Sequence, residues 1–132
     1  MKKLDHIGIA VKNLALAKEA YSTLLNMEPT GREKGADEKG TTLLYQLGET
    51  KIELLEPADV NSPIRDFIEK NGEGIHHIAF EVDDIQSAMD EYKSKGFTFS
   101  HEKPGIHADN KLRVCINPKE THGVMIELCQ SI

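Results

Sequence analysis

The chain has 132 residues, the length of one ordinary domain, so we expect residues 1–132 to form a single domain. Its formal net charge is −6, which excludes non-specific binding to nucleic acid because that requires a basic surface. No apolar run approaches the roughly 20 residues that cross a bilayer, and the N-terminal segment lacks the apolar stretch of a signal peptide. We therefore expect a cytoplasmic protein without nucleic-acid or membrane partners.

A strand and a helix are the first elements expected in chain order. Apolar side chains alternate through residues 4–11, which is typical of a strand. Asn13 is a suitable N-cap for a helix that follows directly. The apolar face of that helix repeats at helical spacing and consists of Leu14, Ala17, Tyr21, Leu24 and Leu25. The first segment therefore predicts a strand followed by an amphipathic helix.

The next segment is predicted to be a polar loop followed by a hairpin. Residues 31–40 are the most polar stretch of the chain, and we expect them to form a mobile loop. Residues 41–47 and 51–55 are two largely apolar runs separated by Gly48 and its neighbours. This pattern indicates a β-hairpin.

A connecting helix is expected at about residues 62–72, with Pro63 in its first turn and Gly72 at its end. The second half then repeats the first, beginning with a strand at residues 75–82 and a helix capped by Asp83 or Asp84. The apolar face of this helix comprises Ile85, Ala88, Met89 and Tyr92. Further strands are predicted at residues 97–100, 112–116 and 124–129.

The two halves match each other in sequence. A shift of 71 residues places His6 on His77, and a shift of 74 residues places Glu53 on Glu127. The helical segments between these positions match as well, as Tyr21 and Tyr92 illustrate. An ordered series of matches favours internal duplication. We therefore expect two modules of strand, helix and three strands at about residues 4–57 and 75–130, which is an α+β fold.

Four polar side chains occupy the centres of strands that are otherwise apolar: His6, Glu53, His77 and Glu127. Side chains alternate between the two faces of a strand, so each of the four lies opposite the face that packs against a helix. A buried charged or imidazole group is usually paired or bound to a metal. One His and one Glu from each module therefore predict a site for a divalent ion such as Zn²⁺, Co²⁺, Ni²⁺ or Mn²⁺.

The same segments give the chain a family resemblance. It resembles the vicinal-oxygen-chelate superfamily, which includes glyoxalase and bleomycin-resistance proteins, and within it the methylmalonyl-CoA epimerases. The segments that carry the resemblance are residues 4–11, 51–57, 62–80 and 123–128. The resemblance implies paired βαβββ modules that form an incomplete barrel around one metal ion held by His6, Glu53, His77 and Glu127. It also implies a homodimer and an acyl-CoA substrate.

The resemblance further implies the reaction. It is the epimerisation of (R)- and (S)-methylmalonyl-CoA, in which the proton alpha to the thioester is abstracted through a metal-stabilised enolate. Inversion needs one base on each face of the carbon. The resemblance assigns one base to Glu127 and the other to Glu38, with Asp37 as the alternative because the alignment of this loop shifts by a residue or two.

Three other functions are compatible with the fold that the resemblance implies. Glyoxalase I uses the same metal ligands on a glutathione hemithioacetal, so the ligand set does not separate it from an epimerase. Non-catalytic binding proteins of this fold typically lack the ligands that this chain retains. A dioxygenase site usually takes two His and one carboxylate on iron, which would leave Glu53 without a role.

Overall fold

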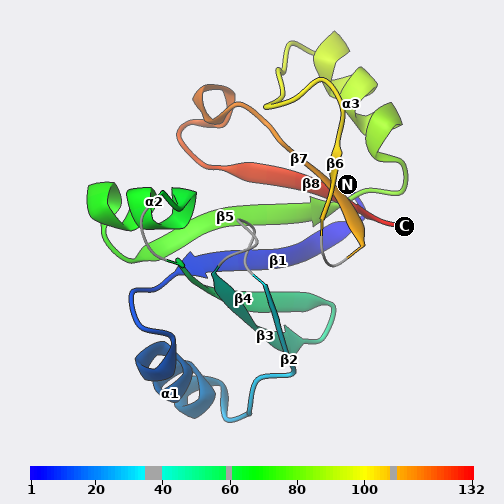
Figure 1. Cartoon of the computed structure of the whole chain (residues 1–132). Coiled ribbons are helices and arrows are strands. Elements are labelled where there is room, and N and C mark those ends of the chain that lie inside the picture. Colours follow the sequence, from blue (N-terminus) through cyan, green and yellow to red (C-terminus); the bar gives the residue numbers. More distant parts are fainter. Residues whose placement is uncertain (35–39, 59–60, 108–109) are drawn as a thin grey trace. The chain divides into compact units, whose positions relative to one another are not determined.

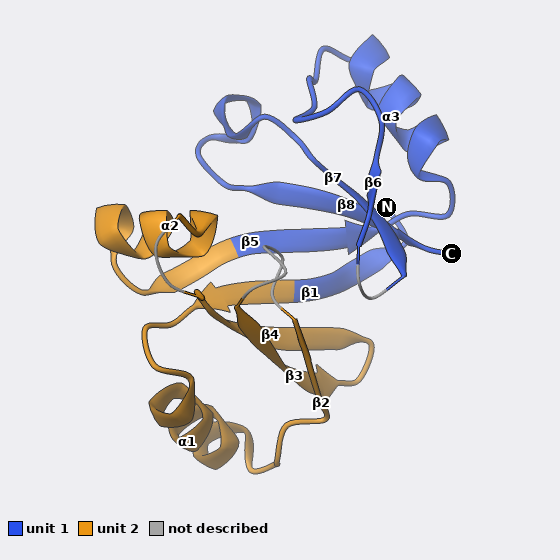
Figure 2. Ribbon diagram, in the orientation of Figure 1, with its two compact units in different colours: residues 1–6, 77–132 blue, residues 7–76 orange. Residues whose placement is uncertain are grey.

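The structure is a computed structural model of the chain, and it describes residues 1–34, 40–58, 61–107 and 110–132. The chain forms two compact units, which comprise residues 7–76 and residues 1–6 with 77–132 (Figures 1 and 2). The division falls inside two strands, β1 (Lys3–Ala10) and β5 (Gly74–Glu81), each of which contributes residues to both units. The expectation of a single domain stays a prediction.

The unit of residues 7–76 contains most of the first module and the connecting helix. Its strands lie in the order β2 (Gly31–Lys34), β3 (Thr41–Leu47), β4 (Thr50–Glu56) and β1. β3 pairs antiparallel with both β2 and β4. Helices α1 (Leu14–Leu25) and α2 (Pro63–Asn71) both contact β4. The predicted helices are thus present at the predicted places.

Helix α1 begins where its sequence predicts. The side chain of Asn13 accepts a hydrogen bond from the backbone N–H of Leu16, and the helix ends at Asn26, which adopts a left-handed backbone with φ of 54°. The face toward the sheet packs into a cluster of Val11, Leu14, Leu43, Tyr45 and Leu54. The assignment of Leu24 to this face was wrong, because its side chain is 76% exposed. At about 3.6 residues per turn, Leu24 lies at the edge of the stripe centred on Leu14, Tyr21 and Leu25, and it faces solvent.

Part of the predicted polar loop is a strand. Residues 31–34 form β2, whose backbone pairs with β3 from Gly31 opposite Leu44 to Lys34 opposite Thr41. Strand pairing uses backbone groups, so a polar segment can form an edge strand while its side chains remain at least partly exposed. The remaining part of the predicted loop, residues 35–39, lies outside the described residues.

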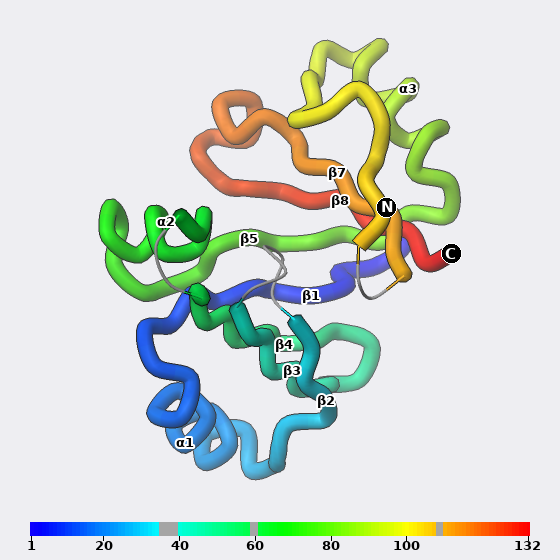
Figure 3. Tube along the Cα trace, viewed as in Figure 1, coloured from blue at the N-terminus to red at the C-terminus, as the bar shows by residue number. Residues whose placement is uncertain are grey.

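The unit of residues 1–6 and 77–132 contains most of the second module. Its strands lie in the order β1, β5, β8 (Ile126–Ser131), β7 (Lys111–Cys115) and β6 (Gly105–Ile106). β8 runs parallel to β5 and antiparallel to β7. Both chain ends belong to this unit, as the colours of Figure 3 allow the reader to follow. The α+β class and the paired strand–helix–strand modules are therefore confirmed.

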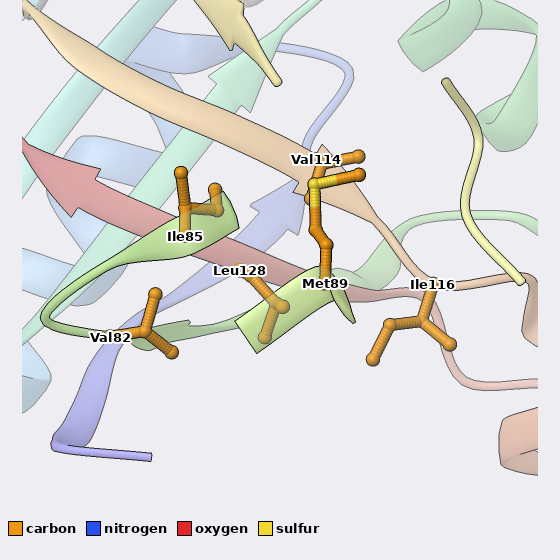
Figure 4. Packing of buried hydrophobic residues seen from close by; sticks show 6 residues of the cluster. All are labelled: Val82, Ile85, Met89, Val114, Ile116 and Leu128. Carbon is orange, nitrogen blue, oxygen red and sulfur yellow. The ribbon is translucent and has the colours of Figure 1, made fainter. Parts of the chain in front are cut away.

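Helix α3 (Ile85–Ser94) covers the apolar core of this unit. Asp84, and not Asp83, is its N-cap, because the Asp84 carboxylate accepts from the backbone N–H of Ser87 at 2.9 Å. The buried core that the helix forms with the strands and with Val82 consists of Val82, Ile85, Met89, Val114, Ile116 and Leu128 (Figure 4). Burial of these side chains removes apolar surface from water and is the main stabilising contribution to the unit.

The strand predicted at residues 97–100 was wrong. This segment makes only an isolated bridge, from Phe99 to Ile116, and the short strand β6 follows later at Gly105–Ile106. The reason lies in its hydrogen bonds. The backbone N–H and the hydroxyl of Thr98 both donate to the carboxylate of Glu120, so the N–H is not available to a strand ladder. Among the residues that the structure describes, no helix is long and apolar enough to cross a membrane.

Candidate metal site

Three predicted ligands converge in the unit of residues 1–6 and 77–132. His6 on β1, His77 on β5 and Glu127 on β8 each offer one ligand atom, and these atoms all lie within 4.8 Å of one another. His6 Nε2 lies 3.0 Å from His77 Nε2 and 3.7 Å from Glu127 Oε1. His6 is fully buried, His77 is 6% exposed and the Glu127 side chain is 13% exposed. The cluster is thus a largely dry group of potential metal ligands.

The strand register brings these side chains to one face. In the parallel pair of β5 and β8, Ala79 lies opposite Glu127, and His77 is two residues before Ala79 on the same face of β5. The alternate positions of β5 and β8 carry apolar side chains such as Phe80 and Leu128, which pack on the α3 side. Strand alternation therefore sends the apolar residues to the helix and the two polar residues to the opposite face.

Asp5 orients the imidazole of His6. The Asp5 Oδ2 atom lies 2.7 Å from His6 Nδ1, so the Nδ1–H donates to the carboxylate and leaves Nε2 to face His77. Lys111 Nζ lies 3.2 Å from both carboxylate oxygens of Asp5, which is 2% exposed. A carboxylate behind a metal-binding histidine fixes both its tautomer and its ring orientation. His6 therefore has the outer support that a metal-ligating histidine usually has.

The donor set and its spacing fit a divalent ion. Bonds of about 2.0–2.2 Å to one ion place neighbouring ligand atoms about 3.0–3.5 Å apart. The separation of 3.0 Å between the two histidine nitrogens falls in this range, and that of 3.7 Å from His6 Nε2 to Glu127 Oε1 is slightly longer. Two imidazoles and a carboxylate are common ligands of borderline divalent metals. The Glu127 carboxylate would have to move toward the two histidines to reach the same range.

A positive charge contacts this donor set. Arg113 on β7 places Nη1 2.8 Å from Glu127 Oε1 and 3.5 Å from His6 Nε2, and its side chain is 13% exposed. The guanidinium thus forms a largely buried, charge-assisted hydrogen bond with the carboxylate that is proposed to bind the metal. Neither Arg113 nor its neighbour Lys111 was among the residues expected from the sequence.

Two thiols lie on the face of β7 and β8 that also carries Arg113 and Glu127. Cys115 is opposite Glu127 in the register of β7 and β8, and Cys129 is opposite Arg113. Burial raises the pKa of Cys115 to about 11, with a further increase from Glu127 and an opposing decrease from Arg113. Burial also raises the pKa of Cys129 to about 12, and Asp5 raises it further. Both residues are therefore protonated thiols at neutral pH and supply no anion to the site.

The remaining predicted site residues lie elsewhere. Glu53 is buried on β4 in the unit of residues 7–76, at 4% exposure and opposite Leu44. Its role as a metal ligand stays a proposal. Glu38 and its alternative Asp37 lie outside the described residues.

The same alternation that identified Glu127 could have identified Arg113. Leu112, Val114 and Ile116 pack against the core, so Arg113 lies on the opposite face of β7. This position has the same parity as that of Glu127 on β8. Strand alternation could not have identified Asp5, because it places Asp5 and His6 on opposite faces of β1. Only the side-chain hydrogen bond shows that Asp5 holds the His6 imidazole.

Comparison with known proteins places the chain in a family. Residues 5–116 match the model of the Glyoxalase/Bleomycin resistance protein/Dioxygenase superfamily. The ethylmalonyl-CoA/methylmalonyl-CoA epimerase of Cereibacter sphaeroides is 38% identical over 130 residues, which cover 97% of each chain. The human mitochondrial methylmalonyl-CoA epimerase is 35% identical over 98% of this chain and 74% of its own length.

Solved structures agree with the sequence comparison. A variant of the Streptomyces coelicolor methylmalonyl-CoA epimerase in complex with 2-nitronate-propionyl-CoA superposes with a TM-score of 0.91 at 28% identity, covering 99% of this chain and 95% of that one. A methylmalonyl-CoA epimerase in complex with methylmalonyl-CoA and NH4⁺ gives a TM-score of 0.90 at 28% identity with the same coverage. The chain therefore belongs to the Glyoxalase/Bleomycin resistance protein/Dioxygenase superfamily and, within it, to the family of methylmalonyl-CoA epimerases.

Proposed function

We propose that the chain interconverts (R)- and (S)-methylmalonyl-CoA with the help of one divalent metal ion. The observation that supports the proposal most directly is the convergence of His6, His77 and Glu127, whose ligand atoms lie within 4.8 Å of one another. The hydrogen bond from His6 to Asp5 adds the outer support expected at a metal site. Relatives named as epimerases, matched over nearly the whole chain, supply the substrate class.

The proposed chemistry removes a proton from the carbon between the thioester and the free carboxylate. When bound, a divalent ion would act as a Lewis acid on the thioester oxygen and make the neighbouring proton easier to remove. Imidazole and carboxylate donors suit Co²⁺, Ni²⁺, Zn²⁺ or Mn²⁺. Glu53 is the proposed fourth ligand, in accordance with its position in the repeated module.

Glu127 is the proposed base on one face of the substrate carbon. Its carboxylate would remove the proton from one epimer, and in the reverse reaction it would deliver a proton to that same face. Inversion also needs a base on the other face. Glu38, or Asp37 in its place, stays the predicted second base, and both lie outside the described residues.

Exchange of the α proton with solvent is the decisive measurement. Metal-free protein would be prepared by chelation, and methylmalonyl-CoA would be incubated with it in deuterated buffer with or without added Co²⁺. We expect deuterium incorporation and interconversion of the two epimers only with metal, and we expect Glu127→Gln to lower both rates by about 10²-fold or more.

Two results would overturn the proposal. The first is conversion of the glutathione hemithioacetal of methylglyoxal without epimerisation, which would indicate a glyoxalase. The second is the absence of bound or acquired metal together with tight binding of a small molecule, which would indicate a non-catalytic binding protein. A homodimer in solution and a cytoplasmic location stay predictions, and sedimentation analysis and cell fractionation would test them.

A further inference from the structure

The guanidinium of Arg113 lies next to the place that a bound metal ion would take. Its Nη1 atom contacts two of the three potential ligands, at 2.8 Å from Glu127 Oε1 and 3.5 Å from His6 Nε2. Those two ligand atoms are 3.7 Å apart. An ion about 2.1 Å from both of them would lie within about 3.5 Å of Nη1, on whichever side of the pair it sat.

A divalent ion and a guanidinium at such a distance repel each other strongly, because the site is largely shielded from water. Both cations also compete for the same carboxylate oxygen of Glu127. The histidines have no comparable freedom, because Asp5 holds His6 and both imidazoles are buried. Arg113 reaches the site with the far end of a long side chain that can rotate away. Metal binding therefore requires the guanidinium to leave Glu127.

Displacement costs the guanidinium its 2.8 Å contact with the Glu127 carboxylate, and a largely buried charge that loses such a contact favours a new anion. Asp5 does not fill this role readily, because Lys111 and His6 already hold it. Asp5, Glu127, Lys111 and Arg113 together carry two negative and two positive charges. With Glu53 added as the proposed fourth ligand, a bound divalent ion would still leave one excess positive charge in this group, which favours an anionic ligand beside the metal.

The geometry points to Arg113 as an exchangeable cation, which neutralises Glu127 in the metal-free protein and binds the free carboxylate of the substrate once metal has taken its place. The second part of this inference rests on the proposed function, which supplies a substrate with a carboxylate on the reacting carbon. A guanidinium suits this task because it can bind a carboxylate through two parallel hydrogen bonds. Arg113 would thus determine specificity for carboxylated thioesters.

The metal part is tested without any turnover. Co²⁺ would be titrated calorimetrically into metal-free wild type, Arg113→Met, Arg113→Lys and the control Arg65→Met, which changes an exposed arginine paired with Glu69 on α2. We expect Arg113→Met to bind Co²⁺ at least about tenfold more tightly, since the competing charge-assisted hydrogen bond is lost. Arg113→Lys keeps a cation and should stay closer to wild type.

Unchanged or weaker binding by a folded Arg113→Met protein would overturn the exchange. Near-ultraviolet circular dichroism of each variant establishes whether it is folded. If Arg113→Met does not fold, the comparison passes to Arg113→Lys and Arg113→Gln, which differ in charge. Equal Co²⁺ affinity of those two variants would then overturn the exchange.

The substrate part is tested at saturating Co²⁺ with two thioesters. For Arg113→Met we expect KM for methylmalonyl-CoA to rise about tenfold or more, while KM for α-proton exchange of propionyl-CoA, which lacks the carboxylate, stays as in wild type. An equal rise for both thioesters would overturn carboxylate recognition. If wild type acts on neither compound, the proposed function and the substrate part fail together, whereas the metal titration still decides the exchange.

Discussion

The two modules share a register but differ in the residues on the strand that pairs with each glutamate. In the first module Glu53 lies opposite Leu44, and Thr42 lies two residues before Leu44 on the same face of β3. In the second module Glu127 lies opposite Cys115, and the position that matches Thr42 is Arg113. The repeated scaffold thus sets where each glutamate lies. At the matching place on the neighbouring strand the first module has a threonine, whereas the second has an arginine whose guanidinium contacts Glu127.

The residues before the two histidines differ in a similar way. Asp5 accepts a hydrogen bond from His6, whereas the residue at the matching place before His77 is His76. The ring of His76 packs edge-on against Phe67 of α2, with centroids 4.9 Å apart, and burial lowers the pKa of His76. One module therefore uses this position to orient a proposed ligand, and the other uses it for apolar packing. The modules have the same framework and different functional detail.

The largest effect is expected at His77, and the same change at the adjacent His76 serves as its comparison. His77→Ala removes a proposed ligand, so Co²⁺ affinity should fall by more than the roughly 100-fold that loss of an outer-shell partner causes. Epimerase activity should be lost with it. His76→Ala removes a ring contact with Phe67 and leaves His6, His77 and Glu127 in place, so this variant should keep the metal. Calorimetric titration of both variants makes the comparison, and strong Co²⁺ binding by folded His77→Ala would remove His77 from the ligand set.

Equivalent core positions test whether the two units contribute comparably to stability. Leu54 and Leu128 occupy matching places in β4 and β8, and both are fully buried. Truncation of either to Ala should lower the free energy of unfolding of the metal-free protein by about 2–5 kcal/mol, through lost burial and a residual cavity. Urea unfolding gives both values. A cost below about 1 kcal/mol at one site would show that its unit is already loosely packed.

Much of this arrangement was predictable because it follows from strand alternation. His6, His77 and Glu127 are polar residues among apolar neighbours, and the structure brings their ligand atoms together. Arg113 has the same parity but was not expected, because a lone arginine in a strand usually reaches solvent. Only the pairing of β7 with β8 shows that it meets Glu127.

The two errors in strand assignment have a common physical origin in side-chain and edge hydrogen bonds. Residues 97–100 carry a strand-like pattern, yet Thr98 bonds to the carboxylate of Glu120 and the ladder does not form. Residues 31–34 carry no apolar pattern, yet they pair through the backbone as an edge strand. Patterns of hydrophobicity report which faces are buried. They do not report where unpaired backbone groups find partners.

A smaller effect is expected from a change at Asp5, the carboxylate that precedes His6 and has no counterpart before His77. Asp5→Asn weakens the acceptor for His6 Nδ1–H and the ion pair with Lys111, so Co²⁺ affinity should fall by about 10–100-fold while the ligands remain. Asp83→Asn is a matched control, because its carboxylate is exposed and pairs with Lys2. Unchanged affinity of Asp5→Asn in a calorimetric titration would mean that Asp5 serves stability and not the proposed metal site.

The smallest effects are expected at the two helix N-caps, which occupy matching places in the two modules. Asn13 accepts from Leu16 N–H at 3.0 Å, and Asp84 accepts from Ser87 N–H at 2.9 Å, at matching places in the two modules. Each change to Ala should cost about 1 kcal/mol in the free energy of unfolding, because one N–H at the start of the helix loses its partner. The Asp84 cost should exceed the Asn13 cost at low salt, since a carboxylate also interacts with the helix dipole.

Salt separates the two contributions of Asp84. Added salt screens the interaction with the dipole and leaves the hydrogen bond, so the Asp84→Ala cost in urea unfolding should fall toward that of Asn13→Ala.

The two caps lie in different units, and their costs should add in the double variant if the units respond independently. A cost of the double variant that departs from the sum by more than about 0.5 kcal/mol would show that the repeated modules are energetically coupled.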